Sequence, residues 1–158
     1  MVHLTRRYRF SAAHRLHNEA LSAEENVGLY GKCNNPRGHG HEYVLEVTVT
    51  GEVDPQTGMV MDLGVLDRLV EREVLDRFDH MHLNLDVANF RERVPTTENL
   101  CIEIYNLLGR SIPDGQPSGS GARLEGVRLE ETRSNFFEYR GPGGHDGAEE
   151  PSGVRRND

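Results

Sequence analysis

Hydrophobic and polar residues alternate near both ends of the chain, which predicts strands there. In the stretch 2–14, apolar residues and polar residues alternate between two faces from Tyr8 onward. This period of two is typical of a half-buried strand. Residues 41–53 alternate in the same way, and residues 122–131 and 135–140 are predicted as two closing strands. We expect the first two strands to pair antiparallel.

Helical spacing replaces this alternation in the middle of the chain. Asp62 is a favourable N-cap for a helix that runs to about Phe78, and the apolar residues between them recur at helical spacing. Thr96 or Thr97 caps a second helix, whose apolar residues recur with the same period. The sequence therefore predicts two amphipathic helices between the two pairs of strands.

Other stretches have no clear period. Residues 17–31 and 79–95 are predicted to be loops, and residues 113–121, rich in Gly, Pro and Ser, to be a flexible linker. Residues 141–158 contain too few apolar side chains to form a core and are predicted to be a disordered tail. We therefore expect a single domain that comprises residues 1–140.

The predicted order of elements is strand, strand, helix, helix, strand, strand. This order is typical of an α+β fold with a four-stranded antiparallel sheet and two helices on one of its faces. An open sheet leaves two unpaired edges, so we expect copies of the chain to associate edge to edge into an oligomer.

Composition narrows the function classes. The chain has 158 residues, a formal net charge of −8 and no run of the roughly eighteen apolar residues that a membrane span needs. This balance gives no reason to expect nucleic acid or an anionic membrane as a partner. Only two cysteines occur, which favours a reducing cytoplasm over a secreted disulfide scaffold.

The candidate chemistry lies between the first two strands. His39 and His41 begin the second strand two residues apart, so their side chains point to the same face and can share a metal ion. A catalytic zinc site needs a third protein ligand, and His14 at the end of the first strand is the best candidate. Cys33 precedes His39 by six residues and follows the single lysine, Lys32, whose charge favours the reactive thiolate.

Seven short motifs resemble, in this order, those of the 6-pyruvoyl-tetrahydropterin synthase family, which includes the 6-carboxy-tetrahydropterin synthases. The motifs are residues 10–16 (FSAAHRL), 31–36 (GKCNNP), 38–41 (GHGH), 58–62 (GMVMD), 79–80 (DH), 95–99 (PTTEN) and 131–132 (ET). Each motif alone is weak, but the whole set in this order is highly specific. The likeness runs from about Tyr8 to Gly141.

The resemblance implies a tunnelling fold (T-fold), in which subunits join their sheets into a barrel. Members commonly form homohexamers of two stacked trimers, with active sites at the subunit interfaces. The substrate implied is 7,8-dihydroneopterin triphosphate, and the cofactor implied is Zn²⁺. The product of such an enzyme serves tetrahydrobiopterin biosynthesis.

The resemblance also implies roles for three groups of residues. Zinc is bound by His14, His39 and His41; protons are transferred by Cys33, Asp79 and His80; and the pterin is anchored by Glu131, helped by Thr96, Thr97 and Glu98. In this scheme Asp79 orients His80. The triphosphate needs cations, and Lys32, Arg15 and Arg37 lie nearest to the motifs in the sequence.

Two alternative functions remain open, namely that of a 6-carboxy-tetrahydropterin synthase and that of a non-catalytic binding protein. The gap of six residues between Cys33 and His39 resembles that of the pyruvoyl synthases, whereas the 6-carboxy-tetrahydropterin synthases of the queuosine pathway usually have a shorter gap. A third subgroup of the family, linked to folate synthesis, has glutamate in place of Cys33, so the presence of Cys33 argues against that subgroup. A non-catalytic pterin- or metal-binding protein of the same fold would not need Cys33, Asp79 and His80.

Several polar residues have simpler interpretations. Glu130 competes with Glu131 for the pterin, but strand alternation puts the two on opposite faces, and the family motif selects Glu131. Cys101 falls on the apolar side of a helix and is expected to be a buried, inert thiol. His17 is expected to have a structural role, and His82 is expected to lie on the surface.

Overall fold

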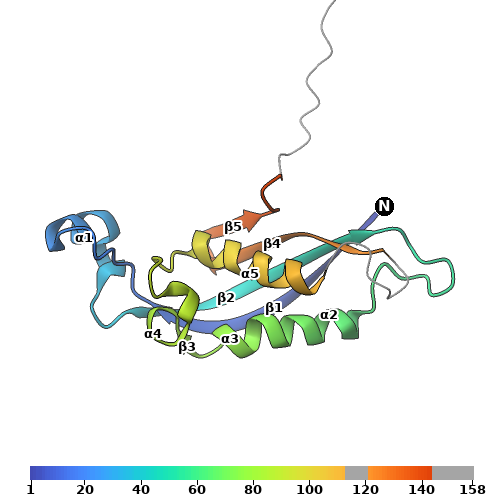
Figure 1. The fold of residues 1–158 in the computed structure, drawn as a ribbon, viewed down its shortest axis with the longest axis horizontal. Helices are drawn as coiled ribbons and strands as arrows, with labels where there is room; N and C mark the ends of the chain where they lie inside the picture. Colours follow the sequence, from blue (N-terminus) through green and yellow to red (C-terminus); the bar gives the residue numbers. More distant parts are fainter. Residues whose placement is uncertain (113–120, 144–158) are drawn as a thin grey trace, which may run out of the picture.

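The computed structural model describes residues 1–112 and 121–143, and these form one sheet with helices on one of its faces (Figure 1). The strands are β1 (Val2–His14), β2 (His39–Gly51), β3 (Met81–His82), β4 (Arg123–Thr132) and β5 (Asn135–Tyr139). Their order across the sheet is β3-β1-β2-β4-β5. The predicted α+β class is confirmed. The predicted linker, apart from Gly121, and the predicted tail beyond Gly143 lie outside the described residues.

The two long strands pair as the alternation predicts. β1 and β2 run antiparallel, in a register that extends from Val2 opposite Gly51 to His14 opposite His39. β4 pairs antiparallel with both β2 and β5. The register therefore brings the end of β1 and the start of β2, which carry the candidate ligands, to one end of the sheet.

The predicted number of strands is wrong, because the described sheet has five. β3 pairs in parallel with β1, with Ala12 opposite Met81, inside the stretch that is predicted to be a loop. A strand of two residues is too short to produce a recognisable period, so the alternation could not reveal it.

The first predicted helix is present and begins at its predicted cap. The Asp62 carboxylate accepts a hydrogen bond from the backbone N–H of Gly64 at 2.7 Å. Three consecutive segments follow, namely α2 (Leu63–Val70), the π-helical segment η2 (Glu71–Leu75) and α3 (Asp76–Phe78). They end at Phe78, as the sequence predicts.

The second predicted helix is α5 (Thr97–Ser111). Thr96 is its N-cap, because the Thr96 hydroxyl accepts a hydrogen bond from the backbone N–H of Asn99 at 3.3 Å. This settles which of the two threonines caps the helix, and it leaves the side chain of Thr97 for another contact.

Four short helical segments were not predicted, so the expectation of only two helices is wrong. They are α1 (Ala23–Tyr30), η1 (Gly31–Asn34), α4 (Leu83–Asp86) and η3 (Ala88–Phe90). α1 projects beyond one end of the sheet in Figure 1, and its one buried residue is Asn26. A capping box between Ser22 and Glu25 closes its first turn. Polar contacts, and not an apolar stripe, hold α1 in position. The sequence therefore has no hydrophobic period from which this helix could be predicted.

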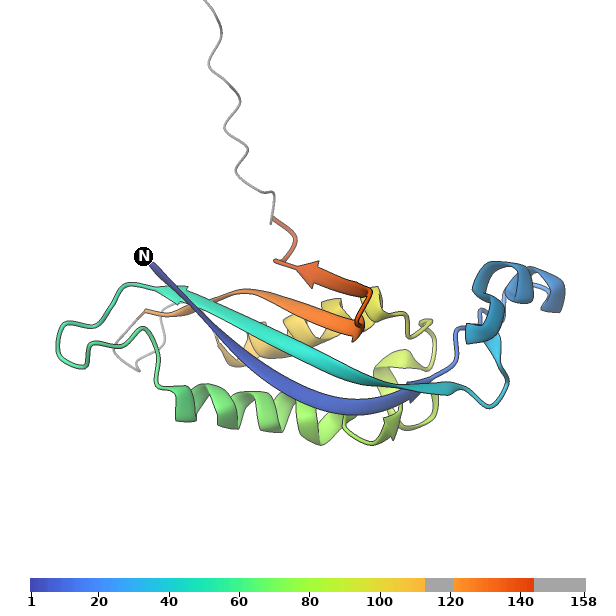
Figure 2. The ribbon, with the colours of Figure 1, turned by 180° about the vertical axis from the view of Figure 1, so that it is seen from behind.

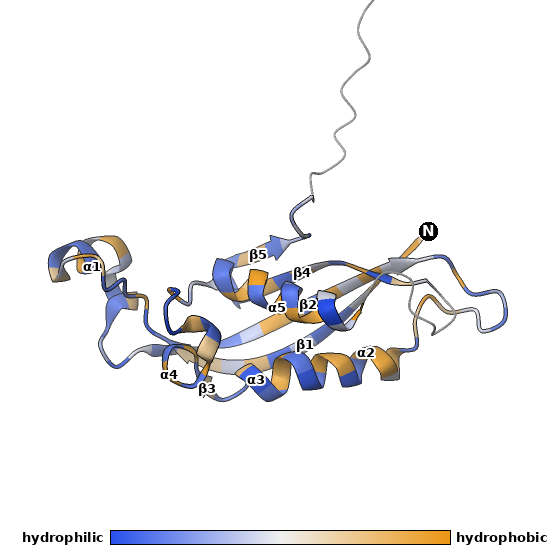
Figure 3. Ribbon diagram, in the orientation of Figure 1, coloured by the Kyte–Doolittle hydropathy of each residue, from blue (hydrophilic) through white to orange (hydrophobic). Residues whose placement is uncertain are grey.

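The hydrophobic core lies between the sheet and the helices. Phe10, Tyr43 and Leu129 from the strands and Leu66 and Ile104 from the helices are each at most 2% exposed. Phe10 and Tyr43 belong to the apolar faces that the alternation predicts for the first two strands. Figure 3 shows hydrophobic and hydrophilic positions interspersed along β2 and α2.

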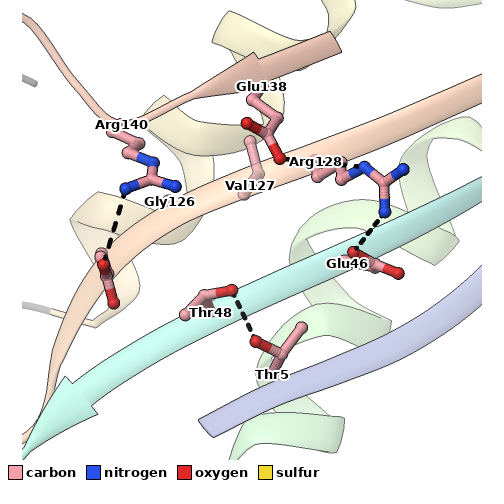
Figure 4. Close-up of a pocket in the computed structure, with 9 residues that line it drawn as sticks. Thr5, Glu46, Thr48, Gly126, Val127, Arg128, Glu138 and Arg140 are labelled. Atoms are coloured by element: carbon pink, nitrogen blue, oxygen red, sulfur yellow. Dashed lines mark hydrogen bonds and ion pairs between the residues drawn. The ribbon is translucent and has the colours of Figure 1, made fainter. Parts of the chain in front are cut away.

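The other face of the sheet is not covered by helices, and Figure 2 views the molecule from that side. It carries hydroxyl and charged side chains, among them Thr5 bonded to Thr48 and Arg128 paired with Glu46 at 3.1 Å (Figure 4). The apolar core is therefore confined to the helical side. None of the helices in the described parts of the chain is long and apolar enough to cross a membrane.

Candidate metal centre and active site

Three histidines meet at the end of the sheet where β1 ends and β2 begins. His14, His39 and His41 each offer a ring nitrogen, and these three atoms lie within 4.8 Å of one another. The Nε2 atoms of His14 and His39 are 3.1 Å apart. The register explains the cluster, because His14 lies directly opposite His39 and alternation puts His41 on the same face. The sequence prediction of this grouping is therefore correct.

His14 is fixed in an orientation that suits a metal ligand. Its side chain is 1% exposed, and Nδ1 donates a hydrogen bond of 2.8 Å to the backbone carbonyl of Pro95. A proton on Nδ1 leaves the lone pair of Nε2 directed at the cluster, as second-shell bonds do in zinc sites. Burial lowers the pKa of His14 to about 4, so the ring is neutral near pH 7.

The cluster fits a zinc ion. Zinc–nitrogen bonds of about 2.0–2.1 Å in a tetrahedral site put neighbouring ligand nitrogens about 3.3 Å apart. The 3.1 Å between Nε2 of His14 and Nε2 of His39 is close to that spacing. Two neutral imidazole nitrogens that face each other at this distance attract each other little unless a proton or a cation lies between them. Three nitrogen ligands also leave the open position that a catalytic zinc site keeps.

Glu131 from β4 lies beside the cluster. Its Oε1 is 3.6 Å from Nε2 of His41 and 3.8 Å from Nε2 of His14. Thr97 donates a hydrogen bond of 2.5 Å to the same oxygen. The expected selection of Glu131 over Glu130 therefore agrees with the geometry, because Glu131 is the one that faces the site.

Glu131 is held as a carboxylate by a second donor that sequence reasoning missed. The side-chain amide of Asn135 donates a hydrogen bond of 2.9 Å to Oε2 of Glu131. Burial alone would raise the pKa of Glu131, but the bonds from Thr97 and Asn135 and the nearby histidines lower it below its ordinary value. The only sequence signal for Asn135 is its place four residues after Glu131, across the β4–β5 turn.

The other two residues of the threonine segment do not reach the cluster. Thr96 is the cap of α5, and Glu98 is exposed in the first turn. Of the residues that the family resemblance assigns to pterin binding, the structure thus brings together Glu131 and Thr97.

Cys33 lies in η1 and is not one of the residues of the histidine cluster. The thiol is free and partly buried. The backbone N–H of Leu16 donates to the Cys33 carbonyl at 2.9 Å, and the Asn34 side chain donates to the Leu16 carbonyl at 2.8 Å. These bonds tie the segment that carries the thiol to the residues that directly follow His14.

Asp79 and His80 form the predicted pair, beside β1 at the edge of the sheet. Nδ1 of His80 is 2.9 Å from Oδ1 of Asp79, and Asp79 accepts a hydrogen bond of 2.8 Å from the backbone N–H of Ser11. This bond is the main cause that lowers the pKa of Asp79. The His80 side chain is 81% exposed and lines a hollow with Ser11, His41 and Glu42.

His82 differs from its prediction as a surface residue. It is partly buried, and its Nδ1 is enclosed without a hydrogen-bond partner in the described structure. A Cβ atom at Gly38 would lie 2.8 Å from Nε2 of His82 and 2.9 Å from the His14 carbonyl. The backbone of Gly38, which has a positive φ of 72°, can therefore pass only because it has no side chain.

Comparison with known proteins identifies the family. The sequence model of one protein family, described as 6-pyruvoyl tetrahydropterin synthase, matches residues 3–142. The chain is 45% identical to the 6-pyruvoyl tetrahydrobiopterin synthase of Poecilia reticulata over 139 residues, which cover 88% of this chain and 90% of that protein. The human protein of the same name is 45% identical over 138 residues, which cover 87% of this chain and 90% of that protein.

The chain belongs to the 6-pyruvoyl tetrahydropterin synthase family. It is an enzyme, and like its curated relatives it is a lyase. It is less similar to the 6-carboxy branch, with 32% identity to a putative 6-carboxy-5,6,7,8-tetrahydropterin synthase of Archaeoglobus fulgidus over 77% of this chain and 90% of that protein.

A solved structure supports the same assignment. The 6-pyruvoyl tetrahydropterin synthase of Caenorhabditis elegans matches with a TM-score of 0.80 and 46% identity, over 89% of this chain and 95% of that chain. The synthase of Plasmodium vivax, at 17% identity and a TM-score of 0.58 over 87% of this chain and 96% of that chain, shares the fold. The predicted T-fold is therefore correct for the chain, with five strands instead of four.

Proposed function

We propose that this chain is a zinc-dependent 6-pyruvoyl-tetrahydropterin synthase. It would eliminate triphosphate from 7,8-dihydroneopterin triphosphate and rearrange the two hydroxyl-bearing carbons of the side chain by internal redox transfer. The observation that carries the proposal is the convergence of three histidine nitrogens with the Glu131 carboxylate at one site. The identity to curated synthases of this name supports it.

The histidines His14, His39 and His41 would hold the zinc ion through ring nitrogens. A zinc ion supplies a Lewis acid that stabilises negative charge on substrate oxygens and makes the neighbouring carbon-bound protons more acidic. The protein's own part is to keep the imidazole of His14 neutral and oriented. The buried bond from His14 to the Pro95 carbonyl supports this role.

Glu131 would anchor the pterin. A carboxylate can accept two parallel N–H bonds from the amino-pyrimidine edge. Each oxygen of Glu131 already accepts one bond, from Thr97 or from Asn135, and a carboxylate has about four acceptor positions, so both oxygens can accept a further N–H. Thr96 and Glu98 would contribute by forming the turn of α5 that presents Thr97.

Replacement of Asn135 by alanine is expected to weaken pterin binding about tenfold, because the carboxylate of Glu131 loses a charged hydrogen bond that fixes its orientation. Fluorescence quenching with 7,8-dihydroneopterin measures the affinity. Ser134→Ala is the matched control, since Ser134 lies in the same turn and its side chain forms no hydrogen bond with Glu131 in the described structure. Equal affinities of the two variants would contradict this role for Asn135.

Cys33 would be the base that removes a proton from the substrate side chain, and Asp79 with His80 would form the second acid–base pair. The exposure of His80 supports a site shared between copies, in which one copy's pair serves the histidine cluster of its neighbour. We accordingly propose a homohexamer of two trimers with joined sheets. Both cysteines are free thiols, which supports a cytoplasmic location.

Product analysis tests the proposed function. Purified protein loaded with zinc is incubated with 7,8-dihydroneopterin triphosphate, and the pterins are identified by mass after oxidation. The 6-pyruvoyl product is expected. A 6-carboxy product with acetaldehyde would move the chain to the queuosine type of reaction. No turnover with zinc bound would favour a non-catalytic pterin- or metal-binding protein.

A further inference from the structure

Residues 94–99 form a tight turn that leads into α5. The backbone N–H of Thr96 donates a hydrogen bond of 2.9 Å to the carbonyl of Val94, across Pro95. A bond between residues two apart is that of a γ-turn, and the ring of the central proline fixes its φ at about −65°. The direction of the Pro95 carbonyl is therefore set by the geometry of this turn.

The turn holds the metal-ligand candidate His14. The Pro95 carbonyl accepts the hydrogen bond of 2.8 Å from Nδ1 of His14, whose side chain is 1% exposed. In metal sites, such an outer hydrogen bond fixes the tautomer and the orientation of the ligating imidazole. A change in the direction of the Pro95 carbonyl would therefore change how Nε2 of His14 is presented to the cluster.

The same turn holds Glu131. Thr97, which is 3% exposed and directly follows the helix cap, donates the hydrogen bond of 2.5 Å to Oε1 of Glu131. That oxygen is in turn 3.8 Å from Nε2 of His14. Because Pro95 and Thr97 are two residues apart, one short segment contacts both the histidine and the carboxylate.

Asn99 closes this turn from the first turn of the helix. Its side-chain amide donates a hydrogen bond of 2.8 Å to the Val94 carbonyl, so that this oxygen accepts bonds from both Asn99 and Thr96. A carbonyl oxygen has two lone pairs and can accept both. Asn99 therefore binds the turn on both sides of Pro95, through its backbone to Thr96 and through its side chain to Val94.

Capping of the helix does not require the side chain of Asn99. The cap bond uses the backbone N–H of Asn99, a group that every residue except proline carries. In the first turn of a helix, an aspartate would suit the macrodipole better than a neutral amide. Donation to Val94, in contrast, requires a side-chain N–H, and an aspartate of the same size has none. The bond to Val94 is thus the contact that calls for asparagine at this position.

We propose that Asn99 is a positioning residue for both halves of the site. By holding the Val94 carbonyl, its amide fixes the Pro95 carbonyl that orients His14. The same bond fixes the start of α5, which presents the Thr97 hydroxyl to Glu131. The inference rests on the proposed function, in which His14 binds zinc and Glu131 binds the pterin. Asn99 itself acts through the turn and contacts neither ligand.

Asn99→Asp tests the proposal, because it removes the donor without changing the size of the side chain. Zinc affinity, measured by competition with a chromogenic chelator, is expected to fall about tenfold, since outer partners of metal ligands contribute about 10–100-fold. The affinity of the zinc-free protein for 7,8-dihydroneopterin is expected to fall at least about threefold. Both are measured well below the Tm of each variant, so that a loss of stability alone would not lower them. Wild-type affinities in Asn99→Asp would overturn the proposal.

Two further variants make the test specific. Asn106→Asp, the same change at an exposed position farther along α5, is the matched control and should keep both affinities. Thr97→Val removes only the hydroxyl that is bonded to Glu131, so it should weaken pterin binding and leave zinc affinity unchanged. Equal losses in Asn99→Asp and Asn106→Asp would overturn the proposal. It would also fail if Asn99→Asp resembled Thr97→Val, because Asn99 would then not position His14.

Nitrogen-15 NMR of the zinc-free protein with labelled histidines separates this inference from the proposed function. Wild-type His14 should be a single tautomer with its proton on Nδ1, as the bond to Pro95 requires, whereas Asn99→Asp should show a mixture of tautomers. Identical spectra would overturn the inference even if the wild type turned over the substrate. If the wild type bound neither zinc nor pterin, the proposed function would fail, but a change of tautomer in Asn99→Asp would still show that Asn99 positions His14.

Discussion

Replacement of Cys33 by alanine is expected to lower the rate of triphosphate release about 10³-fold or more, because positioned acid–base groups contribute about 10²–10⁴-fold to proton transfer. Zinc content and affinity for 7,8-dihydroneopterin should remain those of the wild type, since the thiol makes no bond to the histidines or to Glu131. Single-turnover measurement of released triphosphate gives the rate, and metal analysis gives the zinc content.

Cys101→Ala is the matched control. The Cys101 thiol is buried on α5 against the carbonyls of Val127 and Phe137, and burial raises its pKa to about 12, so it is not a thiolate at neutral pH. Its removal should therefore leave catalysis unchanged. Triphosphate release by Cys33→Ala at the rate of Cys101→Ala would refute the role of Cys33 as the base.

The histidine cluster could be predicted because it depends on local rules. Strand alternation puts His39 and His41 on one face, and an antiparallel pair of long strands brings His14 opposite His39. The same rule allows only one of Glu130 and Glu131 to face the site, and the family motif selects Glu131. Where a side chain's direction follows from the period of its own strand, the sequence is sufficient.

Contacts that depend on tertiary structure could not be predicted in this way. The pairing of Asp79 with His80 follows from their adjacency, but the place of the pair beside β1 is set by their bonds to the backbone of Ser11. Asn135 was missed because it belongs to no motif and acquires its role from its bond to Glu131. α1 was missed for the same reason. Asn26 and the capping box hold this helix in position, and it has no apolar stripe.

His39→Ala is expected to abolish zinc binding and to lower turnover at least about 10³-fold. A Lewis acid contributes several kcal/mol of transition-state stabilisation, and each 1.36 kcal/mol corresponds to about tenfold in rate. His39 is preferable to His14 for this test, because His14 is 1% exposed and is bonded to Pro95, so that its loss would also disturb packing. Metal analysis should find about one zinc ion per chain in the wild type and none in the variant.

His3→Ala is the matched control, because His3 is exposed and pairs with Glu125 far from the cluster. It should retain zinc and activity. Thermal unfolding gives a readout independent of catalysis: an ion that binds only the folded chain stabilises it, so added zinc should raise the Tm of wild type and His3→Ala but not of His39→Ala. A zinc-dependent rise in the Tm of His39→Ala equal to that of the wild type would mean that the metal is bound elsewhere. In that case the convergence of the three histidines would need a different explanation, and the assignment of zinc to this end of the sheet would fail.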